Sequence, residues 1–191
     1  QYYLSLGYYT ETGQFKTEDI DSYNSKLKRD RFNFTSNLDL NVTKTTKLAF
    51  GVNGYLMNYN RPNAGDNAIF GLATTYSPHI TPVRYSNGQW PYLAGTAINP
   101  YQAMTQSGIQ NSYQNAIRSN IKLTQQLGFI TEGLSVSGMF AFDANFDSNL
   151  HRGRTFSGYF AEGRDDQGNL ITRITREGTE NLDFLLTRYS L

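Results

Sequence analysis

The chain has 191 residues, a formal net charge of +1, no cysteine and only 38% hydrophobic residues, with 14 Tyr and 12 Phe. The absence of cysteine excludes disulfides and thiolate metal sites, and the near-neutral charge argues against nucleic-acid binding through bulk charge. No stretch approaches the ~18 apolar residues of a transmembrane helix, but barrel strands are apolar only at alternate positions and stay hydrophilic on average.

Apolar and polar residues alternate in the first part of the chain. Residues 2–10 give a first predicted strand, 29–42 a second and 47–60 a third, with the short turn 43–46 between the last two. Successive side chains of a strand point to opposite faces, so each strand has one apolar and one polar face. The second strand exceeds the ~5–6 residues of a typical soluble strand and matches the ~9–11 of a tilted strand that crosses a bilayer.

The alternation stops at Arg61, and residues 61–112 form a long predicted connection. All five prolines and the only Trp fall within it. Pro100–Thr105 is a candidate short helix with proline in its first turn. Connections are usually ~4–6 residues long, so one of this length needs a small core of its own.

The alternation returns after this connection. Residues 113–127 and 134–149 form two further predicted strands around the short turn 128–133. The signal then weakens, and the sequence Asp-Asp-Gln-Gly marks a turn at 165–168. The last predicted strands are 156–161, 170–176 and 181–191.

Loop lengths alternate between short (43–46, 128–133) and long (11–28, 61–112, 150–180). Outer-membrane barrels have short periplasmic turns, long extracellular loops and aromatic girdles at the membrane boundaries. The aromatic residues expected to form a girdle at the long-loop ends are Tyr8, Tyr9, Tyr55, Tyr59, Tyr113 and Phe146.

These patterns predict an all-β fold, an antiparallel transmembrane β-barrel segment of about six to eight strands with long extracellular loops. A soluble β-sandwich carbohydrate-binding or enzyme domain also alternates and stays an alternative, although its strands are usually shorter and its connections more uniform. A complete small barrel of eight strands is a third possible fold. Residues 1–6 and 187–191 have the pattern of strand interiors, so we expect a piece of a longer protein.

Strand parity separates two sets of wall residues. The set predicted to face the lumen is Arg31, Asn33, Asn37, Asp39, Arg118, Asn120, Lys122, Asp143, Asn145 and Asp147. The set predicted to face lipid is Phe32, Phe34, Leu38, Leu40, Phe50, Val52, Ile121, Leu123, Phe140 and Phe142.

Several short motifs follow one another in order. YLSLGY at 3–8 precedes RFNFTSNLD at 31–39, and a Thr/Lys-rich turn follows at 41–47. NPY, at 99–101, follows the proline-rich part of the long connection. GLSVSG, at 133–138, opens a later strand, and DQGNL, at 166–170, lies in an outer loop. In this order, over residues 1–175, the motifs resemble the barrel of SusC/RagA-type TonB-dependent transporters of Bacteroidota.

The resemblance implies a place in the bacterial outer membrane and a role as a non-enzymatic nutrient importer. Members of the family take up oligosaccharides and sometimes peptides, with a SusD-like surface lipoprotein as a lid and TonB acting on a plug. They close ~22 strands around a plugged lumen. The plug domain and TonB box are absent from this chain, so residues 1–191 would form one stretch of wall, and no cofactor is expected.

Residue patterns for catalysis or metal binding are weak. His79 and His151 are the only histidines, and His79 has no second His or Cys near it in the sequence. Asp143–Asp147 imitates the start of a calcium loop, but Ser148 and Arg154 occupy the positions that require Gly and Glu.

The long connection supplies candidates for contact with a ligand or lid. Tyr and Trp combine a large contact area with a polar group, and Arg is also enriched at interfaces. Holding the connection together, or contacting a partner protein, is favoured over direct ligand binding. The candidates are Tyr76, Arg84, Tyr85, Trp90 and Tyr92.

Overall fold

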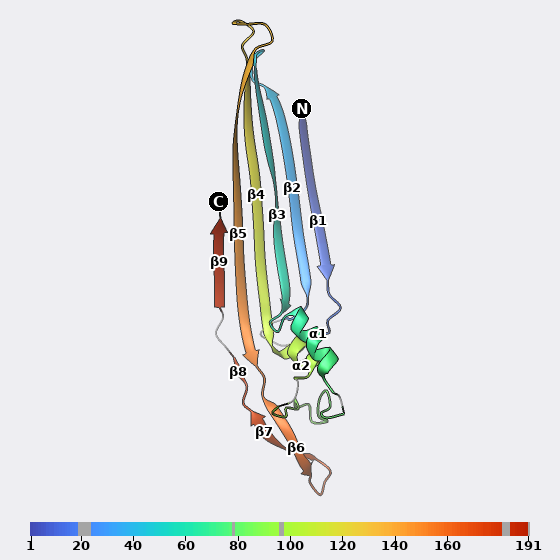
Figure 1. Ribbon diagram of the computed structural model, residues 1–191. Coiled ribbons are helices and arrows are strands. Elements are labelled where there is room, and N and C mark those ends of the chain that lie inside the picture. Colours follow the sequence, from blue (N-terminus) through green and yellow to red (C-terminus); the bar gives the residue numbers. More distant parts are fainter. Residues whose placement is uncertain (19–23, 78, 96–97, 181–183, 191) are drawn as a thin grey trace.

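A computed structural model describes residues 1–18, 24–77, 79–95, 98–180 and 184–190. Its main feature is one antiparallel sheet in which five long strands lie side by side in chain order (Figure 1). Two short strands, β8 (Thr179–Glu180) and β9 (Phe184–Ser190), pair with the last long strand. The long strands are β1 (Tyr2–Thr12), β2 (Lys28–Asn41), β3 (Thr46–Pro62), β4 (Gly108–Gln126) and β5 (Ser135–Thr155).

Four of the five long strands, β1, β3, β4 and β5, are longer than the sequence pattern indicates. The long connection is correspondingly shorter than the predicted 61–112, because β3 continues to Pro62 and β4 begins at Gly108, whose φ of 94° favours glycine. The described residues contain nine strands, against an expectation of six to eight, because two-residue β8 has no alternation to detect. Residues 181–183 and 191 of the predicted final strand lie outside the description.

The all-β class is confirmed, with a mostly antiparallel sheet and two short helices. In the described part of the chain the sheet is open: β1 pairs only with β2, and β5 with its two short partners forms the opposite side. Figure 1 shows a single twisted layer, with both short turns at one end and the two helices at the other.

Both helices lie in the connection between β3 and β4. The predicted helix is confirmed as α2 (Pro100–Gln106), where the Asn99 side chain accepts a hydrogen bond from the Tyr101 amide. Helix α1 (Asp66–Thr75) was not predicted. It follows Gly65 at φ 77°, has no side-chain cap and contains Gly71, so its local helix signals are weak.

A hairpin of β6 (Gly158–Arg164) and β7 (Leu170–Arg176) extends beyond the helices. Asp165 forms its turn by accepting hydrogen bonds from the amides of Gln167 and Asn169 at 2.9 and 2.8 Å. The Asn169 side chain also donates to this carboxylate, and it is the main cause that lowers the pKa of Asp165 below its usual value.

The apolar core lies in the connections rather than on the sheet. We use the term loop cap for α1, α2, residues 76–99 and the β6–β7 hairpin. Of the described buried apolar side chains, only Ala116 and Pro62, the last residue of β3, belong to long strands, and the others are Ile69, Trp90, Pro91, Ala103, Met104 and Phe156. In the part of the chain that the structure describes, no helix is both long and apolar enough to cross a membrane.

Candidate functional site: a two-faced sheet and its loop cap

The strand register places the two predicted sets of wall residues on opposite faces. Directly paired residues of an antiparallel sheet share a face. Asn33 pairs with Tyr55, Tyr55 with Ala116 and Ala116 with Asn145, so one polar row crosses four strands. The same ladder places all ten polar residues on this face, here called the polar face, and all ten apolar residues on the other, here called the apolar face.

Arginine and tyrosine side chains stack where the polar face meets the cap. The Arg31 guanidinium lies 4.3 Å from the centre of the Tyr55 ring and donates from Nε to Asn33 at 2.8 Å. The Arg29 guanidinium lies 4.8 Å from the ring centre of Tyr59. Such stacks order long cationic side chains that would otherwise be mobile.

The predicted aromatic girdle is wrong for half of its members. Tyr9, Tyr55 and Tyr59 pair with Arg31, Asn33 and Arg29, so they belong to the polar face. Their odd numbers already give this parity in the sequence. Tyr8, Tyr113 and Phe146 lie on the apolar face.

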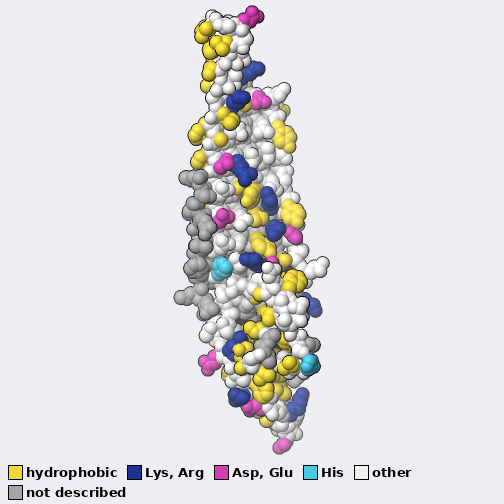
Figure 2. Space-filling model, viewed as in Figure 1, with side chains coloured by type: hydrophobic (Ala, Val, Ile, Leu, Met, Phe, Trp, Pro, Cys, Tyr) yellow, Lys and Arg dark blue, Asp and Glu magenta, His cyan; other side chains and the backbone are white. Residues whose placement is uncertain are grey.

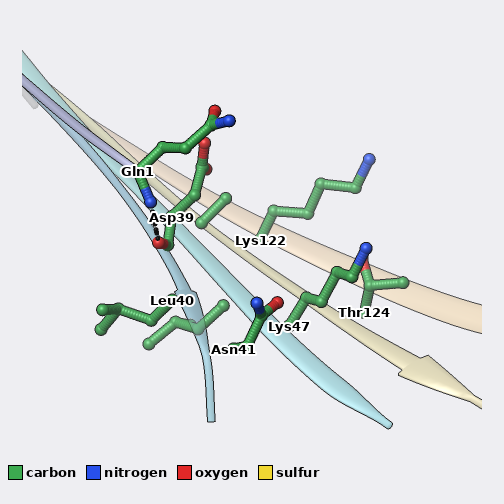
Figure 3. Close-up of a pocket in the computed structure, with 9 residues that line it drawn as sticks. Gln1, Asp39, Leu40, Asn41, Lys47, Lys122 and Thr124 are labelled. Carbon is green, nitrogen blue, oxygen red and sulfur yellow. Dashed lines mark hydrogen bonds between the residues drawn. The ribbon is translucent and has the colours of Figure 1, made fainter. Parts of the chain in front are cut away.

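Two hollows lie on the polar face. One, of about 210 Å³, is lined by Arg31 and Arg118 together with Asn33, Asn53 and Tyr55. The second, of about 420 Å³, lies near the short turns and is drawn in Figure 3. There Lys47 and Lys122 extend to one side of the sheet and Leu40 to the other, while the amino group of Gln1 donates to the Asp39 carbonyl at 2.9 Å.

No second layer of described residues covers the apolar face, which lies on a single sheet. Phe140 is 68% exposed, and Leu6 and Phe32 are 77% and 53% exposed. Between Phe32 and Leu40 this face of β2 extends roughly 27 Å at about 3.4 Å per residue. A strand tilt of about 40° reduces this to roughly 20 Å along a barrel axis, close to the ~25 Å apolar band of outer-membrane barrels.

Polar groups line the cap-side margin of the apolar face. The rings of Tyr8 and Phe32 lie 4.7 Å apart, and the Tyr8 hydroxyl donates to Asp30 at 2.8 Å. Lys28 pairs with the same carboxylate at 2.8 Å. Tyr8 therefore has its ring on the apolar side and its hydroxyl among charges, as aromatic residues do at a membrane boundary.

The five candidates in the long connection all make contacts inside the loop cap. The Tyr76 hydroxyl donates to the Thr81 carbonyl at 2.7 Å, and the Tyr85 hydroxyl accepts from the Ala161 amide at 3.2 Å. The Tyr92 amide donates to the Tyr159 carbonyl at 2.9 Å.

The remaining two candidates, Arg84 and Trp90, lie against each other. The Arg84 guanidinium is 4.1 Å from the centre of the Trp90 ring, which is buried. These contacts support the structural role for the five candidates. Contact with ligand or lid stays a prediction, for which Arg84, an exposed residue, offers the most accessible group.

Glu18 is a functional candidate that sequence reasoning missed. Its carboxylate accepts from the Arg84 guanidinium, the Tyr101 hydroxyl and the Gln106 amide at 3.1, 3.0 and 3.0 Å. Its side chain is 21% exposed. Burial, followed by the hydrogen bond to Glu18, raises the pKa of Tyr101. Glu18 therefore ties the β1–β2 connection to the connection that contains both helices.

Metal-binding geometry is not found in the described ranges, where no group of three or more His, Asp or Glu side chains converges. His79 contacts Ser77 through Nδ1 at 2.9 Å. Asp143 and Asp147 lie on the polar face, directly opposite Arg118 and Gln114. Strand alternation therefore explains the spacing of these two aspartates.

No family model, curated protein or solved structure matches the chain. Its function is therefore inferred from the geometry of the sheet and from the sequence motifs.

Proposed function

We propose that the chain forms part of the wall of an outer-membrane, TonB-dependent nutrient importer of the SusC type. Strands β1–β5 would cross the bilayer, the polar face would line the lumen and the apolar face would contact lipid. The loop cap would lie on the extracellular side and the two short turns on the periplasmic side. Further strands would pair with the open sheet edges, because unpaired backbone groups are not tolerated in lipid.

One observation carries this proposal: five adjacent strands of 11 to 21 residues share a wide apolar face that no described residue covers. Exposed apolar patches on soluble monomers rarely exceed a few hundred Å². A bilayer covers such a face without any second protein layer.

The proposed activity is gated import without catalysis. The wall would provide a rigid, polar path, and the cap would contact the substrate and a SusD-like lipoprotein lid. TonB would act through a plug domain that closes the lumen at rest. Oligosaccharides are the proposed substrate class and peptides the alternative, in accord with the sequence resemblance.

A soluble β-sandwich carbohydrate-binding domain is the competing function. It would place the apolar face against a second sheet, as sandwiches do. The two functions therefore differ in what contacts Phe140: acyl chains in the first and protein side chains in the second.

Site-directed labelling separates them. The chain has no cysteine, so the variants Phe140→Cys and Met139→Cys each provide one labelling position within it. These neighbours are 68% and 71% exposed and lie on opposite faces. In the native protein in vesicles, we expect a lipid-resident quencher to reach only the label at 140 and a water-soluble quencher to reach only that at 139. Quenching of both from water, or recovery of the native protein without detergent, would contradict the proposal.

A further inference from the structure

Positive charges follow one another along the whole polar face. From the cap to the short turns, most levels of the register carry a basic residue of β2, β3 or β4, and the levels of Tyr55 and Gly51 carry none. Figure 2 shows Lys and Arg side chains at successive heights along the sheet. We call this set the basic track: Arg61, Arg29, Arg31, Arg118, Lys122 and Lys47.

Acidic residues on the polar face of β1–β5 are fewer and mostly marginal. Glu11 on edge strand β1 pairs with Arg29 at 3.4 Å, and Asp143 and Asp147 lie on β5. Asp39 is the one acidic residue among the three central strands β2–β4 on this face. The middle of the face is therefore more basic than its sides.

Several cations of the basic track are not held in an ion pair, although two of them have an acidic residue nearby: Asp143 lies directly opposite Arg118, and Asp39 lies at the level of Lys122. Arg118, Lys122 and Lys47 make no hydrogen bond or ion pair with any residue that the structure describes. Both hollows of the polar face are lined by a pair of basic residues, Arg31 with Arg118 in one and Lys47 with Lys122 in the other, where Asp39 also belongs to the lining. Charge and shape, two independent observations, therefore coincide at the same places.

Uncharged hydrogen-bonding groups lie between these cations. Asn37 and Asn120 approach Gly51 from the two neighbouring strands, and an added Cβ there would lie 3.2 and 3.0 Å from their amide oxygens. Asn33 and Asn53 line the smaller hollow. Amides match hydroxyl or peptide groups, and the cations match carboxylates.

We propose that the basic track binds oligomeric solutes that carry carboxylates, with the two hollows as successive binding positions. The proposal deepens the import function and rests on it for the assignment of the polar face to the lumen. A surface of one charge sign raises the local concentration of oppositely charged solutes. Several weak positions in series allow a solute to enter and still leave.

Binding to the detergent-purified native protein tests this proposal directly. The probes are fluorescently labelled hexagalacturonate against uncharged maltohexaose, and a Glu-rich hexapeptide against its Gln counterpart. The variant is the pair Arg118→Gln and Lys122→Gln, and the matched control is Lys44→Gln in the short turn, which removes a charge outside the polar face.

We expect the wild type to prefer the acidic member of at least one probe pair, and this preference to weaken as salt is added. The paired variant should lose about tenfold in affinity for that acidic probe, the change that follows from about 1.4 kcal/mol. The Lys44→Gln control should keep the wild-type affinity. The probe pair that responds identifies the solute as acidic glycan or acidic peptide.

Equal affinity for acidic and uncharged probes, or an unchanged affinity in the paired variant, would overturn the basic track as a binding site. Failure of the import function has a different signature. The labels at 139 and 140 would then both report water, while acidic-probe binding could still be measured in the same preparation.

Discussion

At the scale of single residues, the apolar face depends on a ring that covers a glycine. Phe34 pairs directly with Gly54, and an added Cβ at 54 would lie 2.7 Å from the Phe34 ring atom Cζ. The same Cβ would also meet the Ala116 carbonyl oxygen. An aromatic residue laid over a glycine of the neighbouring strand fixes the strand register. Alternation identifies the face of Phe34 but not this contact.

We expect Gly54→Ala to destabilise the folded protein by about 1–3 kcal/mol, the usual cost of overpacking. Neither neighbour can move cheaply, because one is backbone and the other is an aromatic ring. The matched control is Gly138→Ala on the same face, where no atom lies within 4 Å of the added Cβ. Thermal unfolding in detergent measures both, and equal midpoints for the two variants would contradict the ring-over-glycine account.

At the scale of elements, Glu18 joins two connections that are far apart in the sequence. Its three partners come from the segment before Trp90 and from both ends of α2. Hydrogen bonds to a charged group contribute about 1.5–3 kcal/mol each when well shielded, and less when partly exposed. A single carboxylate therefore orders the loop cap on the β1–β2 side.

Replacing Glu18 with Gln should loosen α2 without unfolding the sheet. The amide keeps the shape but loses the charge, so we expect about 1–2 kcal/mol less protection of residues 100–106 in hydrogen exchange. The control is Glu162→Gln, which removes the exposed pair with Arg173 (46% and 62% exposed) and should change protection by well under 1 kcal/mol. Unchanged exchange in the Glu18 variant would show that α2 is held by packing alone.

Tyr101 makes this same junction sensitive to alkaline pH. Its pKa is raised above the usual 10.0, so the folded state favours the protonated hydroxyl. Its stabilising contribution is complete below pH 10 and is lost as pH rises through the higher pKa of the folded state. We expect hydrogen exchange at residues 100–106, corrected for the intrinsic rate, to accelerate above pH 10 and Tyr101→Phe to remove that step. The same step in both proteins would assign it to another group.

At the scale of the whole molecule, alternation was sufficient to predict the sheet and its two faces. Each strand carries its own period of two, and the register follows because a shift of one residue would reverse every side chain. The helix α1 escaped detection because its glycine cap and Thr-rich end are weak local signals. Glu18 escaped because its partners lie 66 to 88 residues away, a distance at which no local pattern operates.

The girdle error has a different physical origin. Tyr9, Tyr55 and Tyr59 lie near long-loop ends, but proximity to a loop does not determine the face on which a side chain lies. Tyr59 instead faces Arg29 and donates its hydroxyl to Asp66 at 3.1 Å. Strand parity decides on which face of the sheet a tyrosine lies, and its distance from the loop decides only its position along the strand.

Arginine substitutions test the medium on each side of the sheet as a whole. Phe140→Arg would place a guanidinium on the apolar face and Met139→Arg on the polar face, at neighbouring and similarly exposed positions. If lipid covers the apolar face, the first should cost about 2–4 kcal/mol near the bilayer midplane and the second close to nothing. Unfolding by denaturant in vesicles measures both free energies.

A sheet in contact with water on both sides would tolerate the two changes equally, because an exposed side chain in water loses little when it becomes charged. Equal free-energy costs for the two variants would therefore contradict the proposal that the sheet forms the wall of an importer. A cost confined to Phe140→Arg, together with lipid quenching at position 140, would support the proposal.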